Sequence, residues 1–185
     1  MLALVPLLLS APAQADRYSF DDSASSIKFH MVATLHEIDG AVKNFSGEIY
    51  AGEEKETPAS LTIQTSSLTT HLGIRDGRMH EYVMGVEAFP TLKIDVHSIT
   101  GKDLEGFNAG EGSGTIMLNG KMTIRSSTRD VSIPTNYTVK DGAMTLEGAY
   151  SFEWPAFNLP DPSIAISTLQ PKIEVAFEVS AKKTP

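Results

Sequence analysis

Apolar and polar residues alternate with a period of two along most of this 185-residue chain. In the last segment, apolar residues occupy every second position from 173 to 179, with Glu174 and Glu178 between them. Successive side chains of an extended strand point to opposite faces, so this pattern predicts strands that bury one face. We count about eight such segments and no strand-helix-strand rhythm, which indicates an antiparallel sheet. Such a sheet can close into a barrel or pack as a sandwich, and periodicity alone does not separate the two.

The dipeptide Asp141-Gly142 lies between two alternating segments and is typical of a two-residue type I′ hairpin. A turn of fixed length also fixes the register of the strands that it joins. Pro134 in the first strand has no N–H to donate, which favours a strand edge or a bulge at that position. The predicted pairs are Lys140 with Ala143, Val139 with Met144, Tyr137 with Leu146, Ile133 with Tyr150, and Val131 with Phe152.

Residues 70–94 contain the one stretch whose pattern is neither that of a strand nor that of a turn. Its apolar residues recur at i, i+3, i+4 and i+7, which predicts a short helix with one apolar face. We expect Asp76 to cap the start of this helix and Gly85 to end it. A single helix among strands is expected to act as a lid or plug at one mouth, and the glycine-rich residues 101–114 are expected to form a loop. The apolar face consists of Met79, Tyr82, Val83 and Val86.

The composition favours one globular domain that does not bind nucleic acid. Apolar residues make up 41% of the chain, which is enough for a core, and the net charge is −8. Proteins that bind nucleic acid use basic patches to contact phosphates, and the sequence contains no such patch.

Residues 1–15 have the features of a secretory signal peptide. A short apolar run leads to Ala13-Gln14-Ala15, the small-x-small pattern of a signal-peptidase site. We therefore expect cleavage after Ala15, a single mature domain over residues 16–185, and a periplasmic or secreted location. A membrane-spanning helix needs about 20 apolar residues, so no stable membrane span is expected. Because the chain has no cysteine, its stability must come from packing and strand pairing.

Four sequence motifs occur in the order and spacing of a known family. They are GAVKNFSG at residues 40–47, TIQTSSLTT at residues 62–70 followed by Arg75-Asp76, FPT at residues 89–91, and GKMTIRSSTRDVSIP at residues 120–134. With these motifs, nearly the whole mature chain resembles the YceI-like family of exported bacterial domains. The resemblance implies a lipocalin-like barrel that binds a polyisoprenoid or a related lipid. In one departure from the family, His80 lies further along the helix than the histidine that usually follows Arg-Asp.

An apolar barrel interior suits a long hydrocarbon chain, since each buried CH₂ group contributes about 0.8 kcal/mol. Arg75, Arg78 and His80 lie on or beside the predicted helix, where a headgroup phosphate or a quinone oxygen would need hydrogen-bond donors. The alternative is that the apolar residues fill a solid core and that the polar ones are solvated surface residues. The candidate lining residues are Phe29, Met31, Val42, Phe45, Ile63, Met79, Val83, Ile94, Tyr150, Phe152, Ile173, Val175 and Phe177.

The motifs of common enzyme classes are incomplete in this chain. The sequence that begins at His80-Glu81 is close to the zinc helix H-E-x-x-H, but Met84 replaces the second histidine. There is no cysteine nucleophile and no serine in a G-x-S-x-G motif. We therefore predict a lipid-binding protein without catalytic residues, metal or cofactor. The alternatives are an enzyme with a histidine-bound metal or a quinone in its cavity, and an interaction module with a filled barrel; a homodimer stays open.

Overall fold

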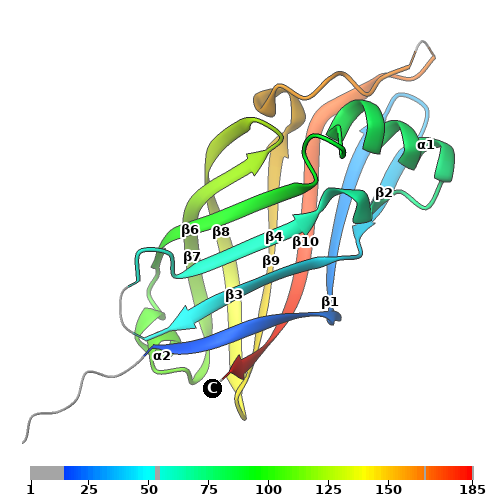
Figure 1. Ribbon diagram of the computed structural model, residues 1–185. Coiled ribbons are helices and arrows are strands. Elements are labelled where there is room, and N and C mark those ends of the chain that lie inside the picture. Colours follow the sequence, from blue (N-terminus) through cyan, green and yellow to red (C-terminus); the bar gives the residue numbers. More distant parts are fainter. Residues whose placement is uncertain (1–14, 53–54, 165, 185) are drawn as a thin grey trace, which may run out of the picture.

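The computed structural model of the protein describes residues 15–52, 55–164 and 166–184, and most of them belong to strands (Figure 1). The predicted signal peptide falls almost wholly on residues 1–14, which lie outside the described residues. The strands are β1 (Asp16–Ala33), β2 (Glu37–Val42), β3 (Phe45–Ala51), β4 (Ala59–Gln64), β5 (Leu68–Thr69), β6 (Thr91–Thr100), β7 (Gly112–Ile124), β8 (Ser127–Lys140), β9 (Ala143–Glu153) and β10 (Leu169–Thr184). The helical segments are η1 (Thr65–Ser67), α1 (Gly73–Arg78), η2 (Met79–Met84), α2 (Leu104–Asn108) and η3 (Trp154–Phe157).

The strands form one antiparallel sheet that closes on itself. Their order is β10-β9-β8-β7-β6-β4-β3-β1-β2-β5, and β1 also pairs with β10 along most of its length. The first half of β1 pairs with β3 and its second half pairs with β2, so β2 and β5 extend the wall at one end of the ring. The remaining eight strands close the barrel. The predicted antiparallel barrel of about eight strands is therefore confirmed, and the sandwich is excluded.

Inward and outward residues alternate along the barrel wall as the sequence predicts. In β8, the residues at positions 131, 133, 135, 137 and 139 are buried, and those between them are exposed. A close approach occurs where Phe29 of β1 pairs with Gly40 of β2. A Cβ atom at Gly40 would lie 2.1 Å from the Phe29 ring. Only glycine at this position therefore leaves room for the Phe29 ring.

The β8–β9 hairpin has the predicted turn and, for most of its length, the predicted register. Asp141 and Gly142 have φ values of 53° and 76°, as a type I′ turn requires. The ladder runs from Lys140 and Ala143 to Thr135 and Gly148 and then ends. The predicted pairs Ile133 with Tyr150 and Val131 with Phe152 do not form. Pro134 cannot donate a ladder hydrogen bond, and beyond it Phe157 of η3 packs against Phe152, with ring centroids 5.4 Å apart.

The predicted helix covers one mouth of the barrel, but its geometry differs from the expectation. It begins as α1 and continues as the π-helix η2, and Gly85 ends it in the left-handed conformation with φ 60°, as predicted. The wider π turn shifts the apolar face, so Met84 is buried while Tyr82 remains 49% exposed. Asp76 lies inside α1 and does not cap it, because the N-cap position is Leu72. None of the helices in the described ranges is long and apolar enough to cross a membrane.

The opposite end of the barrel carries a second helix that the sequence did not indicate. Residues 101–114 were expected to form a loop, whereas α2 forms within them and lies at the far end from α1 (Figure 1). Phe107 of α2 is fully buried and packs edge-on against Tyr137, with ring centroids 5.4 Å apart. The Tyr137 hydroxyl donates a 2.8 Å hydrogen bond to the carbonyl oxygen of Asp103. Phe107, with the partly buried Leu104 beside it, thus anchors α2 to the core.

Candidate ligand-binding cavity

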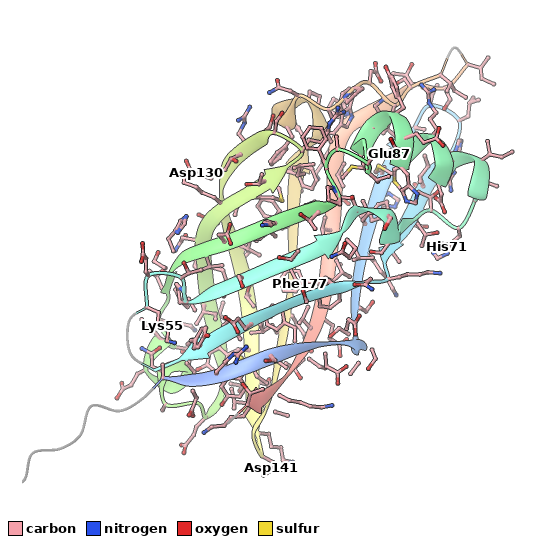
Figure 2. The ribbon with its side chains drawn as sticks, in the orientation of Figure 1. Lys55, His71, Glu87, Asp130, Asp141 and Phe177 are labelled. Carbon is pink, nitrogen blue, oxygen red and sulfur yellow. The ribbon has the colours of Figure 1, made fainter. Side chains whose placement is uncertain are left out.

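The barrel encloses a cavity of about 530 Å³, within the range of roughly 300 to 1,000 Å³ that is usual for small-molecule sites. Its wall is almost entirely apolar and is built from inward-facing strand residues, from α1 and η2, and from the segment that precedes β10. The interior is therefore not a solid core. Phe177 of β10, one of the wall residues, lies between the two ends that His71 and Asp141 mark in Figure 2.

All predicted site residues except Phe45 and His80 lie on the wall of this cavity. The alternation of β1, β6, β9 and β10 places their predicted residues inward, and the lid adds Met79 and Val83. The predicted residues on the wall are Phe29, Met31, Val42, Ile63, Arg75, Arg78, Met79, Val83, Ile94, Tyr150, Phe152, Ile173, Val175 and Phe177.

Phe45 is buried in the wall itself and does not line the cavity. It is the first residue of β3, directly after the break between β2 and β3, and it belongs to the same core cluster as Ile27 and Ile63. His80 is also turned away from the cavity, because its Nε2 atom lies 2.7 Å from the carbonyl oxygen of Leu68. A carbonyl can only accept, so Nε2–H donates and ties η2 to β5. His80 therefore holds η2 against β5 through its Nε2 atom.

A hydrogen-bond network holds the start of the lid on the barrel wall. The Asp76 carboxylate accepts hydrogen bonds from the Thr70 N–H at 2.7 Å, from the Thr70 hydroxyl, and from the Thr69 hydroxyl at 2.8 Å. Burial alone would raise the pKa of Asp76, but these hydrogen bonds from Thr70 and Thr69 outweigh burial and lower it. Asp76 is therefore an ionised anchor that stabilises the lid, and its predicted role as an N-cap is wrong.

The two arginines at the mouth differ in how many of their N–H donors are already used within the protein. Arg75 donates from Nε to the Thr70 hydroxyl at 2.7 Å and from Nη2 to the Thr70 carbonyl at 2.8 Å, so part of its donor capacity is used within the lid. Arg78 is exposed, stacks 4.7 Å above the Tyr82 ring, and reaches the carbonyl oxygen of Ser163 at 3.4 Å. Both line the mouth side of the cavity, and Arg78 keeps more N–H donors available for an anionic or carbonyl group.

Two residues at the lid and the cavity were missed because no local pattern marks them. Arg125, in the tight turn between β7 and β8, donates from Nη1 to the carbonyl oxygen of Val83 at 3.0 Å and lies 5.1 Å from the Phe89 ring centroid. It therefore holds the end of the lid. Ser167 lies in the irregular segment before β10 and lines the cavity. Among the described residues, its hydroxyl is the one buried side-chain polar atom without a hydrogen-bond partner.

The cavity also has wall residues that sequence reasoning did not select. Some of them share the face of predicted residues in β4 and β6, some lie in β7, where no lining residue was predicted, and others lie in the irregular segment before β10, where periodicity gives no signal. They include Leu61, Leu92, Val96, Leu118, Met122, Trp154, Leu159, Ile164 and Leu169.

Within the described ranges, no group of three or more His, Asp or Glu side chains is arranged to hold a metal ion. His30 pairs with a carboxylate on the exposed outer wall, where its Nδ1 atom lies 2.8 Å from Asp39. The hydrogen bond to Asp39 raises the pKa of His30, and the two side chains form a pair on the outer surface.

A sequence profile of the YceI-like domain matches residues 18–181 of the chain. BcnA from Burkholderia cenocepacia has a similar structure, with a TM-score of 0.74 at 17% identity over 88% of this chain and 99% of BcnA. A polyisoprenoid-binding domain from Saccharophagus degradans gives 0.75 at 16% identity over 90% and 98% of the two chains. The YceI protein of Campylobacter jejuni gives 0.62 at 16% identity over 80% and 86%. None of the curated protein sequences matches the chain. At these identities the structural likeness shows the fold.

Proposed function

The chain belongs to the YceI-like family, and on that premise we propose that it is a lipid-binding protein whose barrel holds a polyisoprenoid or a similar apolar chain. The observation that carries this proposal is the cavity of about 530 Å³ with its almost wholly apolar wall. The structurally similar domain from Saccharophagus degradans is described as polyisoprenoid-binding, which supports the same ligand class here.

The hydrophobic effect supplies the affinity in this proposal. Ten CH₂ groups withdrawn from water contribute about 8 kcal/mol, equivalent to a Kd near 1 μM before ordering costs. Such burial is proportional to area and does not depend on direction, so the wall selects for an apolar chain of suitable length and not for one chemical structure.

The polar end of the ligand is proposed to lie at the mouth under α1. Arg78 offers free guanidinium donors there, and the buried Ser167 hydroxyl would gain a partner from a ligand oxygen. An alcohol, a quinone oxygen or a phosphate fits these donors, whereas the tail extends among Phe177, Val175 and Ile94.

Extraction of the purified protein with organic solvent, followed by mass spectrometry, tests the function. We expect an isoprenoid-type lipid in the extract, or uptake of an added prenyl quinone by the delipidated protein. Phe177→Asp places a charge on the cavity wall and should abolish uptake, while Ala176→Asp on the outer face of the same strand should not. Circular dichroism must show both variants folded. A wild-type protein that yields no lipid and takes up no prenyl quinone would rule the proposal out.

Binding and not catalysis is proposed as the activity, and a periplasmic or secreted location as its site. The small-x-small pattern that ends at Ala15 supports export. The mass of the mature protein from the producing cell tests this step, because cleavage after Ala15 leaves Asp16 as the first residue. A full-length protein in the cytoplasm would contradict it.

A further inference from the structure

In the part of the chain that the structure describes, all large apolar side chains that are exposed lie at one end of the barrel. Four segments around the lid-covered mouth carry them: the β1–β2 turn, the start of α1, η2, and the segment before β10 (Figure 1). Soluble surfaces normally scatter such residues singly, so their restriction to one rim indicates a contact surface. This apolar rim consists of Leu35 (66% exposed), Leu72 (52%), Ile74 (88%), Tyr82 (49%), Ile164 (52%) and Ile166 (76%).

The apolar rim continues into the cavity. Leu72, Ile74 and Ile164 are exposed to solvent and also line the cavity wall. An apolar chain that leaves the cavity at this mouth therefore passes along apolar side chains from the interior to the surface. Whatever covers the rim also covers the entrance to the cavity.

Charge does not distinguish the two ends. At the rim end, Arg75 and Arg78 lie near the carboxylates of Glu81 on η2 and Asp161 before β10. The opposite end also carries both signs, on α2 and in the neighbouring turns: Lys102, Asp103, Glu105, Glu111, Lys140, Asp141 and Lys183. The feature that sets the rim apart is therefore its exposed apolar side chains.

We propose that the apolar rim docks on a lipid bilayer and that the lipid enters and leaves the cavity while the protein is docked there. The proposal rests on the lipid-binding function above. Short protruding loops with one or two aliphatic residues each can insert between headgroups, with arginines at headgroup level. Tyr82, half exposed beside Arg78, has the amphipathic ring that is favoured at that depth. A ligand that dissolves only in a bilayer can then move between two apolar phases without crossing water.

Flotation with vesicles of phosphatidylethanolamine and phosphatidylglycerol tests the docking. The wild-type protein should float with the vesicles. The double variant Leu35→Glu, Ile166→Glu changes two exposed rim residues that do not line the cavity. It should bind at least about tenfold more weakly, because two aliphatic residues are lost and two repulsive charges are added. A matched control, Asn108→Glu with Ala143→Glu, adds the same charge at exposed positions of the other end and should bind like the wild type.

A second measurement separates docking from ligand binding. Farnesol, a short prenyl alcohol, can be delivered from water, so the rim variant should bind it like the wild type, while Phe177→Asp should lose farnesol and still float with vesicles. A wild-type protein that does not float, or a rim variant that floats equally well, would overturn the docking proposal. A rim variant that changes from dimer to monomer without any effect on flotation would also overturn it and would assign the rim to a second copy of the chain. A wild-type protein that does not bind farnesol would contradict the lipid-binding function instead.

Discussion

The two ends of the barrel are closed in opposite ways. At the α2 end, the fully buried side chains of Tyr18, Phe107 and Met144 fill the interior, and none of them lines the cavity. At the α1 end, the lid rests on hydrogen bonds to Asp76 and from Arg125 and on the buried side chains of Val83 and Met84, while other aliphatic side chains face the solvent. Packed apolar area is costly to open, whereas polar contacts break and re-form more readily. We therefore expect the α1 end to open more readily than the α2 end.

The two ends also differ in the ionisation of one hydrogen-bonded residue at each end. Burial, and then the nearby Asp103 charge, raises the pKa of Tyr137 at the α2 end, so this phenol stays neutral and keeps its hydrogen bond to Asp103. At the α1 end, hydrogen bonds that outweigh burial lower the pKa of Asp76, so its carboxylate stays charged. A neutral, packed contact is insensitive to pH below 7, and an ionic one is not.

The largest expected effect comes from opening the plug. Phe107→Ala removes a fully buried ring and should lower the free energy of unfolding by about 3 to 5 kcal/mol. Urea unfolding of the ligand-free protein measures this loss of free energy of unfolding. A loss below about 1 kcal/mol would show that α2 is not a structural plug and would break the comparison.

A smaller effect is expected where the lid is anchored. Asp76→Ala leaves the Thr70 N–H without its acceptor and should cost about 1 to 3 kcal/mol. The loss should be local, so hydrogen exchange should accelerate in residues 73–84 and not in residues 104–108. Equal acceleration at both ends would mean that the lid does not open independently.

Acid should loosen the same lid. The pKa of Asp76 is lower in the folded protein than the value of about 3.9 in an unfolded chain. Its contribution to stability is therefore fully present above that pH and is lost as the pH falls through the lowered pKa. Hydrogen exchange of residues 73–84 relative to residues 104–108 should rise between pH 5 and the acid limit of folding, with correction for the intrinsic rates. In Asp76→Asn the relative rate should not change with pH, and a wild-type profile as flat as that of the variant would refute this assignment.

The Ser167 hydroxyl should matter to the ligand and not to the fold. Because it has no partner in the protein, Ser167→Ala should leave the melting temperature equal or slightly higher. The affinity for a prenyl alcohol should fall by about 1 kcal/mol, or roughly fivefold. Calorimetric titrations measure the affinity and melting curves measure the melting temperature. Ser163→Ala, in the same segment, serves as the comparison for both. A loss of stability without a loss of affinity would contradict the role.

The smallest effect on stability is expected on the apolar rim. Ile74→Ser replaces a side chain that is 88% exposed, so the free energy of unfolding should change by less than about 0.5 kcal/mol. Urea unfolding measures this value directly. A much larger loss would mean that Ile74 packs in solution, which would weaken the contrast between the ends.

The sequence predicted those parts of the fold that depend on local pattern. The Asp141-Gly142 turn set its own register, and the alternation around Ile94 and Phe177 placed these side chains on the cavity wall. The closure of β1 on β10 joins residues about as far apart as the chain allows, and alternation alone leaves it open.

Where tertiary contacts override local pattern, the sequence was a poorer guide. Because η2 is a π-helix, Met84 and not Tyr82 lies on the buried face, and no helical periodicity predicts such a turn. Phe107 and Ser167 lie in segments without any period, so only the assembled barrel gives them their roles.

The central claim is that an apolar chain occupies the barrel beneath the lid. Trp154 is the single tryptophan of the chain and lines the cavity, so its fluorescence reports on the interior directly. Titration of the delipidated protein with a prenyl quinone should quench this fluorescence saturably at one ligand per protein, and Phe177→Asp should show no such quenching. Quenching that does not saturate, or that is the same in both proteins, would contradict the account.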